Sequence, residues 1–278
     1  MNTPPQIHCA SATHVGRVRS RNEDCVHTDP ELGLLAIADG MGGHNAGHIA
    51  SRLAIASLIA HLQLAAFGKE NTRGPRSSDA HPQTATEVLQ LLGAAVAQAN
   101  AEVFTAANTL SGCHGMGTTL LAAWIHSSND GTAHLAIAHV GDSRLYRHRP
   151  PNSLISAVGE LKQLTRDHTT LQEFIDDGIT TAEDAHHLMR RSYLTRALGV
   201  ERNLKTDLFD LPFSSDELLL LCSDGLTSML SDPELLALLD DHRTHAGDSL
   251  QALADRLVEA ANAHGGHDNI SVVLATFA

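Results

Sequence analysis

The sequence predicts an α+β fold in which antiparallel β-sheets are covered by helices. Two observations carry this prediction: segments with strand character follow one another along the chain, and segments with helical periodicity occur in pairs. A parallel sheet would instead require strands and helices to alternate one by one. The chain has 278 residues, of which 42% are hydrophobic, so it can bury a substantial core. We expect a single domain spanning residues 1–278.

The first strands are expected near the N-terminus. Residues 7–16 and 24–29 alternate in hydrophobicity, which is typical of strands around a turn. Residues 32–39, LGLLAIAD, form a continuous apolar run, which predicts a strand buried on both faces. Further strand-like segments occur at 117–126, 132–140, 143–149, 204–212, 216–225 and 269–277.

Four helices are expected where apolar residues recur at helical spacing. Residues 46–66 and 85–107 predict two long helices, joined by a polar loop at 68–84 that contains Gly, Pro and Ser. Two long helices joined by a loop pack naturally as an antiparallel pair. Residues 232–241 and 249–265 predict a second pair.

The composition excludes several functional classes. The formal net charge is −13 and basic residues form only short clusters, so we expect no nucleic-acid partner. The N-terminus lacks the basic and apolar regions of a signal peptide, and no apolar run reaches the ~18–20 residues that cross a bilayer. The C-terminus ends with the last expected strand. We therefore expect a soluble, cytoplasmic protein with no membrane anchor. Four separate cysteines, with no CxxC pair, predict free thiols.

Acidic residues follow apolar segments at several places in the chain. One aspartate after a strand is ordinary turn chemistry. Several of them, at the ends of strands that lie side by side, would gather like charges that need a neutralising partner. The aspartates in question are Asp39, Asp142, Asp224 and Asp268, and a further acidic pair, Glu23 and Asp24, lies at the start of the strand at 24–29.

Divalent metal ions are the expected neutralising partner. The candidate ligands are oxygen donors, which suit Mg²⁺ or Mn²⁺. Zinc is disfavoured despite 19 histidines, because no HExxH motif surrounds His44 and His48. Gly40 would present a bare backbone carbonyl to an ion, while Gly42 and Gly43 would permit a positive φ. The glycine spacing matches neither a P-loop nor a GxGxxG motif.

A set of ordered motifs resembles those of a known family. In chain order they are GRVRSRNED, IADGMGGHNAG, GMGTTLLAAWI, VGDSRLY, LTRDHT, LTRALG, LLLCSDGL and HDNISVV. They resemble the motifs of the bacterial PPM family, the metal-dependent type 2C serine/threonine protein phosphatases, over residues 8–277. The resemblance implies a four-layer αββα sandwich, in which two antiparallel β-sheets are flanked by helix pairs. It also implies that residues 165–199 form the flap, a variable segment beside the active site that contributes to substrate choice.

The resemblance assigns the principal metal ligands. Asp39 would bridge two metal ions, Mn²⁺ or Mg²⁺, and the Gly40 carbonyl would bind the second of them. Asp224 and Asp268 would complete the first site.

Other acidic residues are assigned in the same way. Glu23 and Asp24 would bind the second ion directly or through water. Asp142 would help to hold a weaker third ion. Asn269, which follows the ligand Asp268, would orient that ligand from behind.

The resemblance also implies the reaction and its participants. The enzyme would hydrolyse phosphoserine and phosphothreonine in proteins by direct attack of a metal-bridging hydroxide. Arg19 would bind the phosphate, and His44 would protonate the leaving alkoxide. Neighbouring Arg17 and Arg21 are expected to be solvated. A signalling role opposing a serine/threonine kinase and a monomeric state are implied as well.

Two alternatives stay open at this stage. A catalytically inactive relative would only dock a partner, although every metal-binding position is filled here. A two-metal hydrolase of small phosphomonoesters or nucleotides would use the same ligands. Phosphatase activity with manganese would distinguish an active enzyme from the inactive relative. A comparison of phosphopeptide with nucleotide substrates would distinguish a protein phosphatase from the hydrolase of small phosphomonoesters.

Overall fold

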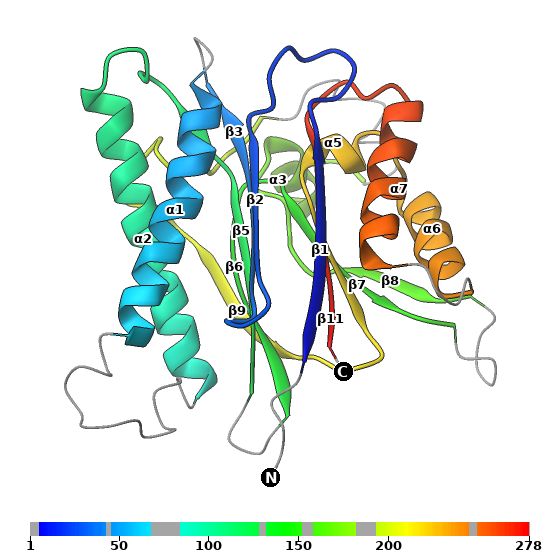
Figure 1. Ribbon diagram of the computed structural model, residues 1–278. Helices are drawn as coiled ribbons and strands as arrows, with labels where there is room; N and C mark the ends of the chain where they lie inside the picture. The colour runs from blue at the N-terminus through cyan, green and yellow to red at the C-terminus, as the bar shows by residue number, and fades with distance from the viewer. Residues whose placement is uncertain are drawn as a thin grey trace.

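Two antiparallel β-sheets pack face to face, and helices cover the outer face of each (Figure 1). The structure is a computed structural model. It describes residues 6–42, 46–67, 84–127, 132–151, 158–181, 193–244 and 249–277.

The first sheet joins the two ends of the chain. Its strand order is β1-β11-β10-β7-β8. Ile7 lies opposite Phe277 and His14 opposite Ile270, so the first and last strands pair along their whole length. The strands are β1 (Ile7–His14), β11 (Ile270–Phe277), β10 (Leu218–Cys222), β7 (Arg144–Arg149) and β8 (Glu160–Gln163).

The second sheet contains the apolar run noted in the sequence. Its order is β2-β3-β5-β6-β9, and the short strand β4 pairs with the end of β3. The strands are β2 (Asp24–Asp29), β3 (Leu34–Met41), β4 (Gly117–Thr118), β5 (Leu120–Ser127), β6 (Ala133–Val140) and β9 (Asp207–Pro212).

Strand β3 is buried on both faces. Leu35 and Ile37 point toward the other sheet, where they meet Leu219 and Leu221 of β10. The alternate residues of β3 face the helices on the other side. This two-sided burial explains why the run is continuously apolar.

A helix pair covers each outer face. Helices α1 (Gly47–Phe67) and α2 (Ala85–Thr109) lie over the second sheet, and α6 (Asp232–Thr244) and α7 (Leu250–Ala263) lie over the first (Figure 1). Two shorter helices are α3 (Thr170–Asp176), between β8 and β9, and α5 (Asp224–Thr227), between β10 and α6. The expected α+β sandwich with paired helices is therefore confirmed.

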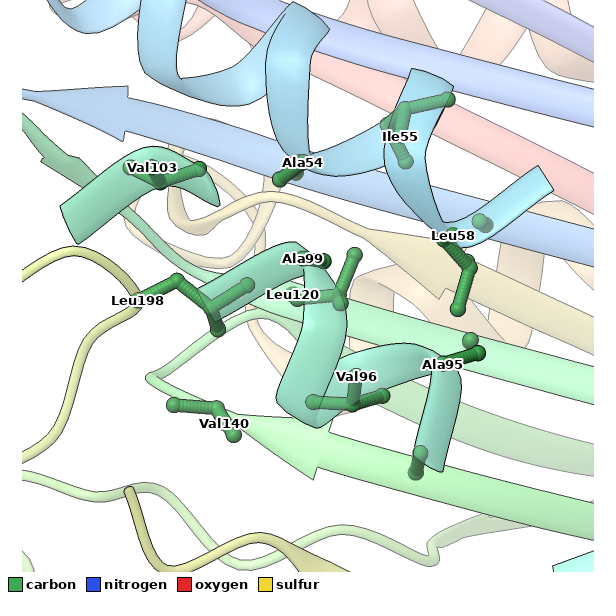
Figure 2. Packing of buried hydrophobic residues seen from close by; sticks show 14 of the residues in the cluster. Ala54, Ile55, Leu58, Ala95, Val96, Ala99, Val103, Leu120, Val140 and Leu198 are labelled. Carbon is green, nitrogen blue, oxygen red and sulfur yellow. The ribbon is translucent and has the colours of Figure 1, made fainter. Parts of the chain in front are cut away.

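The contact between α1 and α2 is built largely from small side chains. Ala54 and Leu58 of α1 pack near Ala95 and Ala99 of α2, above Leu120 of β5 (Figure 2). Alanines at this contact let the two helices approach closely, so both can reach the sheet.

Helix α1 is long and strongly apolar. Gly47–Ala65 is the one stretch among the described residues that is long and apolar enough to cross a membrane by length and composition. Its buried residues, including Ala50 and Leu62, belong to the core cluster against the sheet. The same properties are found in core helices, and we assign α1 to that class.

Several element boundaries differ from the sequence prediction. The strand expected at 216–225 ends at Cys222, because Ser223 and Asp224 begin helix α5. Strand β9 begins at Asp207, not 204. Strand β8 was not expected, since its four residues carry little pattern. Of the expected loop at 68–84, residues 68–83 lie outside the described part of the chain.

Candidate active site and metal centre

Five of the six acidic residues singled out in the sequence line one pocket, and the sixth, Asp24, is buried behind Asp39. The β1–β2 loop and α5 lie at the same end of the molecule, away from the N-terminus (Figure 1). The pocket there has a volume of about 240 Å³. Its walls include Arg19, Arg21, Glu23, Asp39, Gly40, Met41, Gly42, Thr119, Asp142, Leu194, Asp224, Asp268 and Asn269.

Asp24 and Asp39 face each other across two paired strands. Asp24 begins β2 and is the direct partner of Asp39 near the end of β3. Directly opposed residues on antiparallel strands point to the same face, and like charges there repel. The hairpin therefore brings two carboxyl groups together, of which Asp39 lines the pocket.

Ser223 connects the two sheets beneath this pair. Its hydroxyl donates to Asp24 Oδ2 at 2.8 Å and accepts from the backbone N–H of Ser271 at 3.0 Å. Ser223 is the N-cap residue of α5, yet its side chain makes no capping bond to that helix. The hydroxyl is used to hold Asp24 beside Asp224, the first residue of α5.

The loop before β2 is held by Asn269. The Asn269 side chain accepts from the Glu23 N–H at 2.8 Å and donates to the carbonyls of Val15 and Arg21, both at 2.9 Å. Its own N–H donates to Asp268 Oδ1 at 2.9 Å. The side chain thus supports the β1–β2 loop, whereas Asp268 is contacted by the backbone of Asn269.

Glu23 is held where β3 meets α1. Its carbonyl accepts from the Ser51 hydroxyl at 2.5 Å and from the Gly40 N–H at 3.2 Å. The ring of His48 lies 3.9 Å from Glu23 Oε1. The side chain is thereby directed along the pocket wall.

Two glycines permit this junction. A Cβ on Gly40 would lie 2.1 Å from the carbonyl oxygen of Gly47, which begins α1. Any larger residue would push the helix away from the strand. Gly42 has φ +146°, and a Cβ there would meet Met116 at 2.9 Å. The expected positive φ of Gly42 is present, while Gly43 lies outside the described residues.

The environment shifts the protonation of the carboxyl groups. Burial raises the pKa of Asp39 well above its usual value, and Asp24, Asp224 and Asp142 raise it further. Burial also raises the pKa of Asp24 to about 6, against the opposing hydrogen bonds from Ser271 and Ser223.

The same effects act on the other two aspartates. Burial raises the pKa of Asp142 to about 7, with Asp224 and Asp167 adding to the effect. Burial and the charge of Asp268 raise the pKa of Asp224. These carboxyl groups cannot all ionise without a positive partner.

The comparisons with known proteins agree with this geometry. A family model described as protein phosphatase 2C matches residues 13–263. This chain belongs to that family. The serine/threonine phosphatase stp of Listeria monocytogenes is 36% identical over 271 residues, covering 96% of this chain and 95% of the relative. The serine/threonine protein phosphatase PstP of Mycobacterium tuberculosis is 36% identical over 97% of this chain, which matches 45% of that protein.

Solved structures of the protein phosphatase 2C family share the fold. The catalytic domain of PstP in complex with two manganese ions has a TM-score of 0.75 and 34% identity, covering 98% of both chains. Stp1 of Staphylococcus aureus has a TM-score of 0.77 and 26% identity, covering 99% of this chain and 97% of that one. The predicted family, fold class and enzyme class, a serine/threonine protein phosphatase, are confirmed.

The residues present fit the divalent ions that the family implies. One carboxylate oxygen each of Glu23, Asp24 and Asp224 is buried without a hydrogen-bond donor among the described residues. Such orphaned oxygens are costly unless a cation or donor meets them. The donor set is all oxygen, which suits Mg²⁺ or Mn²⁺. Within the described ranges, no three His, Cys, Asp or Glu side chains are arranged so that they could hold a metal ion as they stand.

The structure describes only one of the two residues expected to contact the substrate, Arg19 and His44. Arg19 lines the pocket and donates to Asp268 Oδ2 at 2.6 Å, with 55% of its side chain exposed. The Asp268 carboxylate raises the pKa of Arg19 further above its usual value. His44 lies outside the described residues, so its expected role stays a prediction.

Sequence reasoning missed several residues of the site. Thr119 accepts from the Asp39 N–H at 2.9 Å and its own N–H donates to the Asp39 carbonyl at 2.9 Å. Leu194 and Arg21 also line the pocket. Arg21 is exposed, as expected, and so is Arg17. The GTT sequence at 117–119 directly before an apolar strand was the available signal, but its partner Asp39 lies 80 positions away.

Proposed function

We propose that this chain hydrolyses phosphoserine and phosphothreonine in phosphoproteins with the help of two Mn²⁺ or Mg²⁺ ions and a weaker third. The main observation that supports this proposal is the composition of the pocket. Five acidic side chains and Arg19 line it, and buried carboxylate oxygens within it have no donor.

The metal-binding roles follow the arrangement of the strands. Asp39, which is paired with Asp24 and lies near Asp224, would contribute to both ion sites, and Asp224 and Asp268 would complete the first. The Gly40 carbonyl would bind the second ion, and Glu23 and Asp24 would bind it directly or through water. Asp142 is assigned to the weaker third ion. Ions bound by such carboxylates activate water for attack on phosphorus and balance charge on the phosphoryl oxygens.

Arg19 is proposed as the phosphate-binding residue. Its guanidinium is positioned at the pocket rim by Asp268. When Asp268 shares its charge with a cation, the guanidinium becomes available to fork onto two phosphoryl oxygens. His44 is proposed to protonate the leaving serine or threonine oxygen, which is too basic to leave unprotonated.

The chain's organisation and setting are part of the proposal. We assign residues 1–278 to one catalytic domain, with 165–199 as the flap beside the pocket, because Leu194 from this segment lines it. The enzyme would oppose an ATP-dependent serine/threonine kinase as a monomer in the cytoplasm, where such kinases act. The four free cysteines fit that reducing compartment. The acidic net charge of −13 disfavours nucleic acid and acidic membrane surfaces as partners.

Phosphatase assays test this function. With Mn²⁺, we expect faster turnover of a phosphothreonine peptide than of nucleotides, and hydrolysis of p-nitrophenyl phosphate as well. Asp39→Asn should lower kcat/KM by at least about 100-fold, since it removes the bridging ligand. The matched control is Asp255→Asn, on the exposed face of α7, which should retain the parent activity.

Two results would overturn the proposal. A clear preference for nucleotides would identify a hydrolase of small phosphomonoesters. No turnover of any phosphoester in Mn²⁺ or Mg²⁺ would identify an inactive docking protein.

A further inference from the structure

The structure assigns a positioning function to His168, a buried residue that does not line the pocket: its imidazole holds the peptide of Gly141 and so fixes Asp142 at the pocket wall. This inference rests on the proposed role of Asp142 as a metal ligand. It concerns the support of that ligand, for which the sequence predicted no residue.

His168 and Gly141 make a reciprocal pair of hydrogen bonds. The Gly141 N–H donates to Nδ1 of the His168 imidazole at 3.0 Å, and the backbone N–H of His168 donates to the Gly141 carbonyl at 2.8 Å. Gly141 immediately precedes Asp142. Gly141, the residue before Asp142, is therefore held at its N–H by the His168 imidazole and at its carbonyl by the His168 backbone.

The opposite side of the same turn is fixed by Thr119. The Thr119 and Ser143 hydroxyls lie 2.9 Å apart, and a Cβ on Gly141 would meet the Thr119 side chain at 2.6 Å. Thr119 also bonds the backbone of Asp39. Asp142 is thus held between Thr119 and His168, and its position is tied to that of Asp39.

The contacts of His168 determine its tautomer. A backbone N–H can only donate, so Nδ1 must carry a lone pair and Nε2 must carry the proton. The Nε2–H donates a hydrogen bond to Asp207 Oδ2 at 3.1 Å. Arg196 Nη1 also lies 3.0 Å from Nε2, but neither nitrogen can accept in this tautomer, so that approach is a contact and not a hydrogen bond. Arg196 donates to the other oxygen of Asp207 at 2.8 Å and so holds the acceptor in place.

The neutral ring is favoured by its surroundings. His168 is 5% exposed, and its ring stacks on that of His139 with centroids 4.7 Å apart. Burial lowers the pKa of His168, against the opposing hydrogen bond to Asp207. A protonated ring would lose the Nδ1 acceptor and release the Gly141 N–H.

His168 belongs to the segment at 165–199 and joins its two ends near Asp142. The Thr195 N–H donates to the His168 carbonyl at 2.9 Å, and Thr169 forms a bridge with Leu194. Leu194 lines the pocket. One residue therefore ties the base of this segment to the turn that carries Asp142.

A pair of matched variants tests the inference. In His168→Asn the side-chain oxygen can occupy the position of Nδ1 and accept from Gly141, whereas in His168→Gln the amide reaches only toward the position of Nε2. We expect His168→Gln to weaken the Mn²⁺ binding that depends on Asp142 by about tenfold or more, as is typical for residues that support ligands. His168→Asn should recover most of that binding.

Calorimetric Mn²⁺ titration is the principal measurement, because it does not depend on turnover. Asp142→Asn and the double variant Asp142→Asn/His168→Gln complete a cycle. If His168 acts through Asp142, the double variant binds Mn²⁺ no more weakly than Asp142→Asn alone. Equal losses in His168→Asn and His168→Gln, or unchanged Mn²⁺ binding with only a lower melting temperature, would overturn the inference.

The outcomes separate this inference from the proposed function. A parent protein that binds Mn²⁺ but hydrolyses no phosphoprotein would contradict the function and leave the binding cycle intact. If His168→Gln does not fold, His168→Leu replaces it, since it fills the site without an acceptor for the Gly141 N–H. Parent-like Mn²⁺ binding in folded His168→Leu would then overturn the inference.

Discussion

Asp39 and Asp255 are the same amino acid in very different settings. Asp255 lies exposed on α7. Asp39 opens only onto the pocket and lies deep among protein atoms, opposite Asp24 and within the field of Asp224. Burial and the neighbouring carboxylates favour the neutral form of Asp39. In the metal-free protein the ionised carboxylates repel one another, and a bound cation would remove this repulsion. The catalytic capacity of this carboxylate comes from its position.

His139 shows a second consequence of burial at the same scale. It is fully buried in β6, and burial with the neighbouring His168 lowers its pKa to about 3. The unfolded chain therefore binds more protons than the folded one between pH 6.5 and pH 3. The stability that depends on neutral His139 is complete above pH 6.5 and is lost as the pH falls toward 3.

Replacement of His139 should reduce this sensitivity to acid. In His139→Leu we expect the dependence of the free energy of unfolding on pH to change by about 1.4 kcal/mol per pH unit below pH 6.5. Urea unfolding of both proteins with EDTA at pH 7, 6 and 5 measures this. Parallel pH profiles for the two proteins would contradict the argument.

At the scale of elements, the site depends on the close approach of β3 and α1. The Gly40 and Gly47 backbones touch, and this contact places Glu23 beside the Gly40 carbonyl. The two elements have no sequence feature other than glycine that would predict the approach. Their junction positions two of the proposed ligands at once.

Gly40→Ala tests the importance of this contact. Its Cβ would lie 2.1 Å from a backbone oxygen, so we expect a loss of stability above about 3 kcal/mol and a loss of activity. Gly112→Ala is the matched control. Gly112 also cannot accept Ala without strain, since its φ is +82°, but nothing lies within 4 Å of the new methyl group. It should cost only about 1–2 kcal/mol, with activity retained.

Equal costs for the two alanine variants in denaturant unfolding would show that the β3–α1 contact is not essential. The activity of Gly112→Ala serves as the reference for that of Gly40→Ala.

At the scale of the whole molecule, face-to-face packing of the sheets brings the carboxylates together. Asp24 and Asp39 come from one sheet, while Asp224 and Asp268 adjoin β10 and β11 of the other. Neither sheet alone contains the pocket. Folding and metal binding are therefore coupled, because the ligand set exists only in the folded chain.

The stabilisation by Mn²⁺ should increase with pH. The pKa values of Asp24 and Asp142 are raised to about 6 and about 7, so the metal-free folded state binds more protons than the unfolded chain. Their contribution to stability without ions is present below about pH 4 and is lost as the pH rises through 6 to 7. Mn²⁺ competes with these protons and restores stability at high pH.

Thermal unfolding with Mn²⁺ and with EDTA at pH 5.5, 6.5 and 7.5 measures this effect. Mn²⁺ at about 100 times its dissociation constant should add about 2.7 kcal/mol at the highest pH. The gain should be smaller at pH 5.5. An equal gain at every pH would contradict the linkage.

The sequence by itself determined the order of the elements and the identity of the acidic candidates. Periodicity and turn chemistry are local, so the run ending at Asp39 and the paired helices were visible without a structure. Short or irregular pieces, such as β8 and the start of α5 at Asp224, carry too little local pattern and were not predicted correctly.

Only the tertiary structure decided how these residues contact one another. Ser223 and Asp24 are 199 positions apart, and His168 and Gly141 are 27 apart, yet each pair is hydrogen-bonded. Such contacts depend on strand order and on the packing of the two sheets. Local sequence patterns carry no information about either, because the free energy of those contacts is gained only when distant segments meet.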